Sequence, residues 1–210
     1  MAEHGTYTFR CDSLGHRFGR RRLFSDISFE LQQPGSVCIT GPNGSGKSTF
    51  LKIVVGLLQP ARGKTALLLD GGELSASDSR QHLGLVAPDL FLYGELTAAE
   101  NLTFFARLRR LPNPNRDWNE TLASVGLEGR AKERVGNFSS GQRQRMKYLI
   151  ATLHNPPLLL LDEPTANLDD AGRAIVSDIV LKQRQSGLLI VATNDREEYA
   201  FGDRVVTLVE

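Results

Sequence analysis

The sequence predicts an α/β protein whose parallel-sheet core is interrupted by a helical subdomain. The first observation is a strand, a glycine-rich loop and a helix in succession over residues 37–58. The second is that residues 88–154 hold three helix-like segments with no strand between them. The third is that apolar runs typical of buried parallel strands return at 158–161 and 188–193. These observations divide the chain into 1–87, the first part of the core with a β-rich subdomain, 88–154, the helical subdomain, and 155–210, the rest of the core.

The N-terminal part of the chain is rich in strand signals. Thr6–Cys11 and Asp26–Leu31 alternate between apolar and polar residues, as half-buried strands do. Between them, Gly15–Arg22 contains a basic run that we expect to be a solvated turn. Two further strands are expected at Thr65–Leu69 and Gln81–Ala87.

A glycine-rich loop follows the strand Val37–Thr40 and precedes the helix-like run Phe50–Leu58. It fits the phosphate-binding pattern G-x-x-x-x-G-K-[ST]. Glycines let the backbone curl so that N–H groups converge on an anion, and the following helix adds the positive end of its dipole. The lysine would reach the β- and γ-phosphates, and the first hydroxyl would ligate Mg²⁺. The sequence therefore predicts a nucleotide-binding loop made of Gly41, Pro42, Asn43, Gly44, Ser45, Gly46, Lys47, Ser48 and Thr49.

Three helix starts follow one another in the middle of the chain. Thr97–Glu100 has the sequence of a capping box, and apolar residues then recur at helical spacing. Asp117 opens a second helix, which we expect to stop at Gly126. Ser139 caps a third helix, which we expect to reach Leu153.

The apolar run Leu158–Leu161 ends in two acidic residues. Emerging from a buried strand, Asp162 would hold Mg²⁺ opposite Ser48, through water. Glu163 would orient or deprotonate an attacking water. A strand end whose acids merely face solvent is the alternative interpretation, and the glycine-rich loop earlier in the chain argues against it. A helix from Asp169–Asp170 to near Gly187 and a last strand at Arg204–Val209 complete the predicted core.

Composition bears on the ligands that the chain binds and on the compartment in which it works. The net charge of +1 gives no reason to expect nucleic acid as a ligand. The two cysteines, Cys11 and Cys38, follow no disulfide or metal pattern, which indicates a reducing cytoplasm. No apolar run approaches the roughly 18–20 residues that cross a bilayer, so we expect no membrane span.

The chain resembles the ATP-binding-cassette (ABC) ATPases over essentially its whole length. The loop at 41–49, the Phe138–Gln142 element, the Leu158–Glu163 strand and Ala166–Asp169 occur in the family's order. The Ser-Ser-Gly-Gln element makes the match specific, because the loop alone is shared with many nucleotidases. The resemblance implies a P-loop NTPase (RecA-like) core with an N-terminal antiparallel β-subdomain and an inserted α-helical subdomain.

The resemblance also implies a mechanism that needs two copies of the chain and uses ATP with Mg²⁺. Relatives bind two ATP molecules between head-to-tail copies, and the serine-glycine-glutamine helix of one copy caps the γ-phosphate held by the other. A capped helix start suits that role, since it offers N–H donors to an anion. Phe18 matches the aromatic that stacks on adenine, although packing within a turn is the other interpretation, and Asp169 matches an aspartate through which relatives communicate between sites. The capping element here consists of Ser139, Ser140, Gly141 and Gln142.

The chain departs from the family pattern at three positions. Where relatives carry a glutamine that touches Mg²⁺ and the attacking water, this chain has Pro88, and Asp89 would substitute as a metal ligand if the register shifts by one. A switch histidine is replaced by Asn194, whose amide still donates to a γ-phosphate but does not titrate. Ser140 stands where relatives have glycine, which is a mild change. Because Glu163 is intact, we expect a competent ATPase that is slow or dependent on a partner.

The resemblance implies the ATP-driving subunit of a membrane transporter, peripheral at the inner face of the cell membrane and paired with a separate integral membrane subunit. In relatives that subunit docks beside the segment that corresponds to Pro88–Tyr93. The apolar candidates there are Leu90, Phe91 and Tyr93, for which burial in the subdomain's own core is the alternative.

A second interpretation is an ATP-gated clamp that hydrolyses weakly, does not transport and regulates a partner complex. The substitutions at the glutamine and histidine positions would suit such a switch. Among transporters, the short chain and its Leu96–Leu102 stretch look most like haem-exporter-type (cytochrome c biogenesis) cassettes.

Overall fold

The computed structural model describes residues 5–209 and consists of two compact units. The sheet unit comprises residues 5–87, 157–164 and 180–209, and the helical unit comprises 88–156 and 165–179. The sheet unit contains one antiparallel and one parallel sheet, which confirms the predicted α/β class.

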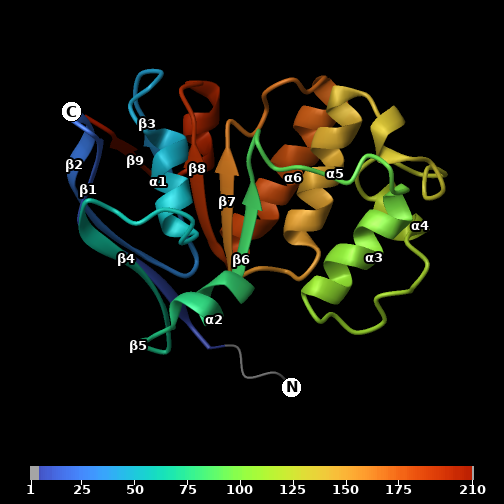
Figure 1. Cartoon of the computed structure of the whole chain (residues 1–210), viewed down its shortest axis with the longest axis horizontal. Helices are drawn as coiled ribbons and strands as arrows, with labels where there is room; N and C mark the ends of the chain where they lie inside the picture. The colour runs from blue at the N-terminus through green and yellow to red at the C-terminus, as the bar shows by residue number, and fades with distance from the viewer. Residues whose placement is uncertain (1–4, 210) are drawn as a thin grey trace. The chain divides into compact units, whose positions relative to one another are not determined.

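The antiparallel sheet has the strand order β2-β1-β4-β5 (Figure 1). The predicted solvated turn at Gly15–Arg22 is wrong. The first strand runs on to Phe18, the second begins at Arg21, and only Gly19 and Arg20 form the turn. Strand pairing satisfies the backbone here while the long basic side chains stay in solvent, so a charged run is compatible with a hairpin end. The strands are β1 (Tyr7–Phe18), β2 (Arg21–Gln32), β4 (Arg62–Leu69) and β5 (Gly72–Glu73).

The second sheet is parallel, with the order β6-β7-β8-β3-β9. Its central strands β3, β7 and β8 are buried along their whole length, as their apolar sequences predict. Figure 1 shows β6, β7 and β8 running side by side in the same direction. The strands are β3 (Gly35–Thr40), β6 (Leu83–Val86), β7 (Leu158–Asp162), β8 (Leu188–Ala192) and β9 (Arg204–Thr207).

Helix α1 (Lys47–Val54) joins the two sheets into one core and so fixes the glycine-rich loop before it. Its Phe50 is fully buried, with its ring centroid 6.2 Å from those of Phe24 and Phe29 on β2. The other side of the helix contacts β7 and β8. Apolar packing from both sheets therefore holds the start of α1 in place.

Two elements of the sheet unit differ from the sequence expectation. Helix α1 ends at Val54 rather than Leu58, because Gly56 adopts a left-handed conformation with φ of 73° that terminates the helix. Helix α2 (Ala76–Gln81) was not predicted at all. Its start is capped by Ser75, but none of its residues is buried, so it lacks the apolar periodicity by which helices are recognised. A short 3₁₀ helix, Glu197–Phe201, precedes β9.

The helical unit packs around Leu102, Leu122 and Met146, all fully buried. The predicted capping boxes at Thr97 and Ser139 are both present. Among the described residues, no helix has the length and apolarity to span a membrane. The helices are α3 (Ala98–Leu108), α4 (Asn119–Ala123), the 3₁₀ helix Val135–Asn137, α5 (Ser140–Thr152) and α6 (Asp170–Ser186), whose last residues belong to the sheet unit.

Candidate nucleotide site

The loop between β3 and α1 has the curled backbone that its glycines predict. Gly41, Gly44 and Gly46 have φ values of 149°, 83° and 100°, a region that side-chain-bearing residues rarely adopt. At Gly46 space is short as well, since a Cβ would lie 3.0 Å from Leu23 Cβ and from Phe24 Cδ1. The loop is thus shaped both by glycine conformations and by close packing against β2.

Lys47 and Glu163 face each other at this loop. The Lys47 ammonium donates to the Gly41 carbonyl at 2.9 Å and lies 3.9 Å from Glu163 Oε1. The lysine side chain is 7% exposed and the glutamate 31%. A cation and a carboxylate are therefore placed together at the mouth of a loop built for phosphate.

The pKa of Glu163 is raised above its ordinary value of 4.5. Burial is the main cause, and the nearby carboxylates Glu198 and Asp162 add to it, while Lys47 and a hydrogen bond from the Thr193 hydroxyl oppose it. A carboxylate destabilised in its charged form is a better proton acceptor, which suits the predicted role of general base.

Asp162 and Ser48 are the residues that could share a magnesium ion with a bound nucleotide. Asp162 is 3% exposed at the end of β7, and Ser48 is exposed in the first turn of α1. Across residues 5–209 no group of three or more His, Cys, Asp or Glu side chains could hold a metal. One carboxylate and one hydroxyl fit Mg²⁺, which is usually bound by few protein ligands together with phosphates and water.

Asn194, at the position of the family's switch histidine, contacts the loop directly. Its side-chain amide donates a hydrogen bond of 2.9 Å to the side-chain oxygen of Asn43. Asn194 follows β8, which lies between β3 and β7 in the sheet, so its place beside the loop results from strand order. No motif in the sequence indicates that these two amides would meet.

A pocket of about 370 Å³ opens at the loop and gathers Phe18, Glu163 and six of the nine predicted loop residues. Phe18 lines it with 56% of its surface exposed and contacts His16 edge to face at 4.8 Å. Packing within the hairpin therefore leaves more than half of the Phe18 side chain exposed, and its stacking on adenine stays a prediction. The sequence did not predict two of the lining residues, Arg21 and Leu23. Their positions beside the pocket depend on the pairing register of β1 with β2. The lining residues are Phe18, Arg21, Leu23, Asn43, Gly44, Gly46, Lys47, Ser48, Thr49 and Glu163.

The predicted capping element lies in the helical unit, at the start of α5. The Ser139 hydroxyl accepts from the Gln142 N–H at 3.2 Å, and the Gln142 side-chain oxygen accepts from the Ser139 N–H at 2.9 Å. Ser139 and Ser140 are exposed, and Gly141 is partly exposed. The 13-residue helix therefore presents a rigid start, with the positive end of its dipole, to an external anion.

Pro88 and Asp89 are exposed, and the helical unit anchors this segment through α5. The Lys147 ammonium donates to the Pro88 carbonyl at 2.8 Å. Burial lowers the pKa of Lys147, and the charge of Asp89 opposes that shift. The part of Asp89 as a metal ligand stays a prediction.

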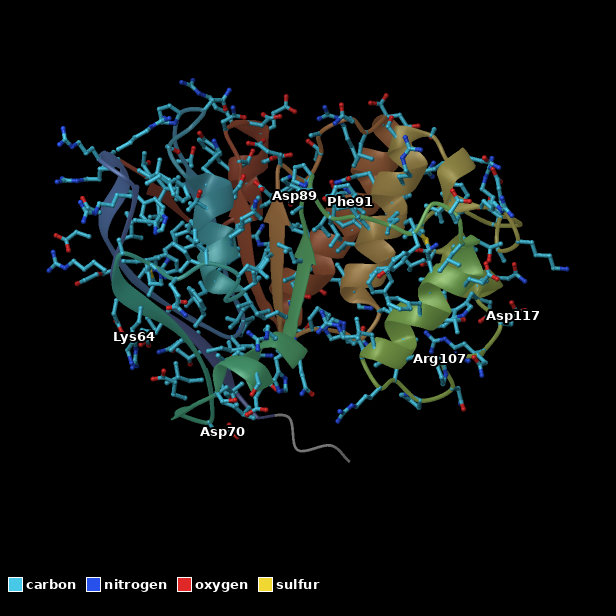
Figure 2. All side chains as sticks on the ribbon, viewed as in Figure 1. Lys64, Asp70, Asp89, Phe91, Arg107 and Asp117 are labelled. Atoms are coloured by element: carbon cyan, nitrogen blue, oxygen red, sulfur yellow. The ribbon has the colours of Figure 1, made fainter. Side chains whose placement is uncertain are left out.

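Aromatic side chains are exposed farther along the same segment. Figure 2 labels Asp89 and Phe91 on it, and Phe91 is 85% exposed. Tyr93 is 50% exposed and packs edge to face on Phe104 of α3 at 4.9 Å. Leu90 is partly buried. For Phe91 and Tyr93, burial in the subdomain core is therefore not the right interpretation.

The known proteins to which this chain is similar are ATP-binding proteins and ABC transporters. A linearmycin resistance ATP-binding protein of Bacillus subtilis is 30% identical over 190 residues, covering 88% of this chain and 60% of the relative. The ABC transporter A family member 4 of Dictyostelium discoideum is 29% identical, covering 91% of the chain and 12% of the relative. A lipoprotein-releasing system ATP-binding protein of Hydrogenovibrio crunogenus is 35% identical, covering 90% and 86%. The chain thus spans 60% and 12% of the lengths of the first two relatives, less than two thirds of each.

Solved structures give the same result. The ATP-binding subunit of an ABC transporter superposes with a TM-score of 0.83 at 26% identity, covering 95% of this chain and 85% of the other. A dimeric ATP-binding cassette, MJ0796, in a post-hydrolysis state bound to ADP and Pi, gives 0.82 at 26% identity, covering 95% and 94%. The ABC transporter family model matches residues 24–166. With a glycine-rich loop, acidic strand end and capped helix in the family's order, the chain belongs to the ABC transporter family.

Proposed function

We propose that this chain is the ATP-hydrolysing subunit of an ABC transporter, which pairs with a second copy around two ATP molecules and drives a separate transmembrane subunit. The observation that supports it most is the placement of Glu163 against Lys47 at the mouth of the phosphate loop. A merely nucleotide-binding protein has no need of a carboxylate with a raised pKa there.

The chemistry follows from the chain's own groups. The loop N–H groups and Lys47 bind the β- and γ-phosphates, and Phe18 stacks on the adenine. Glu163 accepts a proton from the attacking water, and Asn194 donates its amide to the γ-phosphate, exchanging the bond to Asn43. Ser48 and Asp162 would hold Mg²⁺, which would neutralise charge on the phosphates.

The second copy completes each site. Its Ser139–Gln142 element would present N–H donors and a helix dipole to the γ-phosphate, which is a preorganised electrostatic contribution. The similarity to a dimeric cassette over 95% of the chain supports this pairing. Asp169, whose side chain accepts from the Gly172 N–H at 2.9 Å, is the candidate for communication between sites.

A membrane subunit is the proposed partner of the exposed aromatic segment. Tyr93 and Phe104 pack together on the helical unit, Phe91 is exposed two residues before Tyr93, and exposed aromatic side chains favour protein interfaces. Binding there would place the chain in the cytoplasm, peripheral at the inner face of the cell membrane. The kind of transporter, haem exporter or other, stays a prediction.

The second candidate is the ATP-gated clamp, favoured by the residues at two catalytic positions. Asn194 is a neutral donor already engaged by Asn43, and the Pro88 carbonyl is held by Lys147.

Purification from native membranes, followed by mass spectrometry and reconstitution with the recovered partner, tests the two candidates. ATP-dependent movement of a solute supports transport, whereas ATP binding that alters the partner without solute movement supports the clamp.

The pH dependence of turnover is a direct consequence of Glu163. Only the ionised carboxylate accepts a proton, so we expect kcat to fall as pH drops through its raised pKa, above 4.5. Wild type should show no second titration from Asn194, since an amide is neutral, whereas Asn194→His should add one near pH ~6.5. Initial rates in overlapping buffers measure both, with Trp118 fluorescence as the folding control. An acid limb at or below 4.5 in wild type would contradict the assignment.

A further inference from the structure

We propose that Arg21 is an additional nucleotide-binding residue, whose guanidinium binds the α/β-diphosphate that ATP and ADP share. The inference rests on the proposed function, because it adds a contact in the same pocket. The loop pattern does not include this residue, and the sequence placed it in a solvated turn.

The hairpin between β1 and β2 brings Arg21 to the pocket. Phe18 and Arg21 are cross-strand partners on either side of the turn at Gly19 and Arg20. Both side chains line the pocket. The group that would stack on the base and the guanidinium therefore come from the same end of one hairpin, and a nucleotide bound through Phe18 would pass Arg21.

The guanidinium is held at the outer turn of the phosphate loop. Its Nη2 donates to the Gly44 carbonyl at 3.3 Å, and a Cβ on Gly44 would lie 3.0 Å from the same nitrogen. Glycine at 44 thus gives Arg21 room to approach. Within residues 5–209 this is the one hydrogen bond found for a group with five N–H donors, so most of its binding capacity remains for a ligand.

Charge and position together select the diphosphate. Arg21 is exposed, as are its neighbours Arg20 and Arg22, but only Arg21 lines the pocket. A planar guanidinium binds phosphate oxygens through paired hydrogen bonds. Lys47 and Glu163 lie at the end of the pocket where the γ-phosphate would bind. Arg21 belongs to the hairpin end that carries Phe18, the residue proposed to stack on the base. The α/β-diphosphate is the part of the nucleotide between the base and the γ-phosphate.

The test compares Arg21→Gln with Arg22→Gln, a neighbouring exposed arginine on the same strand that loses the same charge. Titration calorimetry with ADP and with ATP, both with Mg²⁺, should show about tenfold weaker binding of both nucleotides in Arg21→Gln, equal to about 1.4 kcal/mol. The KM for ATP should change more than kcat, and Arg21→Lys should recover part of the loss. Arg22→Gln should change the dissociation constants by less than about twofold.

Four results would overturn the assignment. Equal losses in Arg21→Gln and Arg22→Gln would mean that the hairpin acts through diffuse charge. A lower melting temperature of nucleotide-free Arg21→Gln, with kcat lowered and KM raised by the same factor, would show that Arg21 stabilises the loop rather than binding nucleotide. An unchanged dissociation constant for ADP in Arg21→Gln, while Lys47→Ala binds ADP more weakly than wild type, would reject this inference alone. A wild type that binds neither nucleotide would reject the proposed function together with it.

Discussion

Glu163→Gln should lower the kcat of ATP hydrolysis by about 10²–10⁴-fold, the usual contribution of a general base. The amide keeps the shape of the side chain but cannot accept a proton from water. Binding should survive, because the loop and the Lys47 ammonium remain in place and the competing carboxylate at 3.9 Å has lost its charge. Phosphate release at saturating ATP and Mg²⁺ measures the rate, and calorimetry measures the binding.

A matched control makes this result specific. Glu197→Gln makes the same chemical change at an exposed glutamate near the C-terminal end of the chain, and should leave turnover within about twofold of wild type, as surface substitutions usually do. Equal, background-level rates for wild type and Glu163→Gln, with the proposed membrane partner present, would show that Glu163 does not support ATP hydrolysis.

Lys47→Ala should weaken ATP binding strongly and lower turnover. The ammonium is almost fully buried and is held by the Gly41 carbonyl at 2.9 Å, so its position toward the phosphates is fixed before ligand arrives. Charge-assisted hydrogen bonds contribute about 1.5–3 kcal/mol each, which predicts affinity losses of about 10–10²-fold and a further loss in kcat.

Lys182→Ala is the control, since this exposed lysine on α6 loses the same charge away from the pocket. Calorimetry with ATP compares the two variants, and thermal melting checks that both fold. ATP affinity in Lys47→Ala equal to that of Lys182→Ala would show that the glycine-rich loop does not hold the triphosphate.

Local patterns in the sequence were sufficient for the central strands and the loop. The runs at 158–161 and 188–192 are apolar throughout, and such runs are buried wherever the sheet forms. The loop is specified by glycine conformations and a lysine that are adjacent in the chain. The capping boxes at Thr97 and Ser139 are local for the same reason, since each joins residues three apart.

Features that depend on non-local pairing could not be predicted. The full lengths of β1 and β2 follow from their pairing with each other, and β1 is irregular at several bulges. Arg21 therefore appeared to be a solvated turn residue. The contact between Asn194 and Asn43 depends on the position of β8 between β3 and β7, which no motif specifies. Helix α2 has no buried face and so no periodic signal.

If each catalytic site is shared by two copies of the chain, a mixture of two inactive variants should regain activity. Lys47→Ala removes the loop's cation, and Gly141→Asp places a negative charge at the helix start that should meet the γ-phosphate. Apart from the helix itself, only the Asn167 carbonyl oxygen among residues 5–209 lies within 4 Å of a Cβ at position 141, at 3.8 Å. An acidic residue also suits a helix N-terminus, so folding should be preserved.

Each variant alone should hydrolyse ATP at background. An equal mixture should recover about a quarter of wild-type turnover, since half of randomly formed dimers are mixed and each mixed dimer keeps one intact site. A mixture that stays at background, while both variants are folded and Gly141→Asp binds ATP, would contradict the shared site.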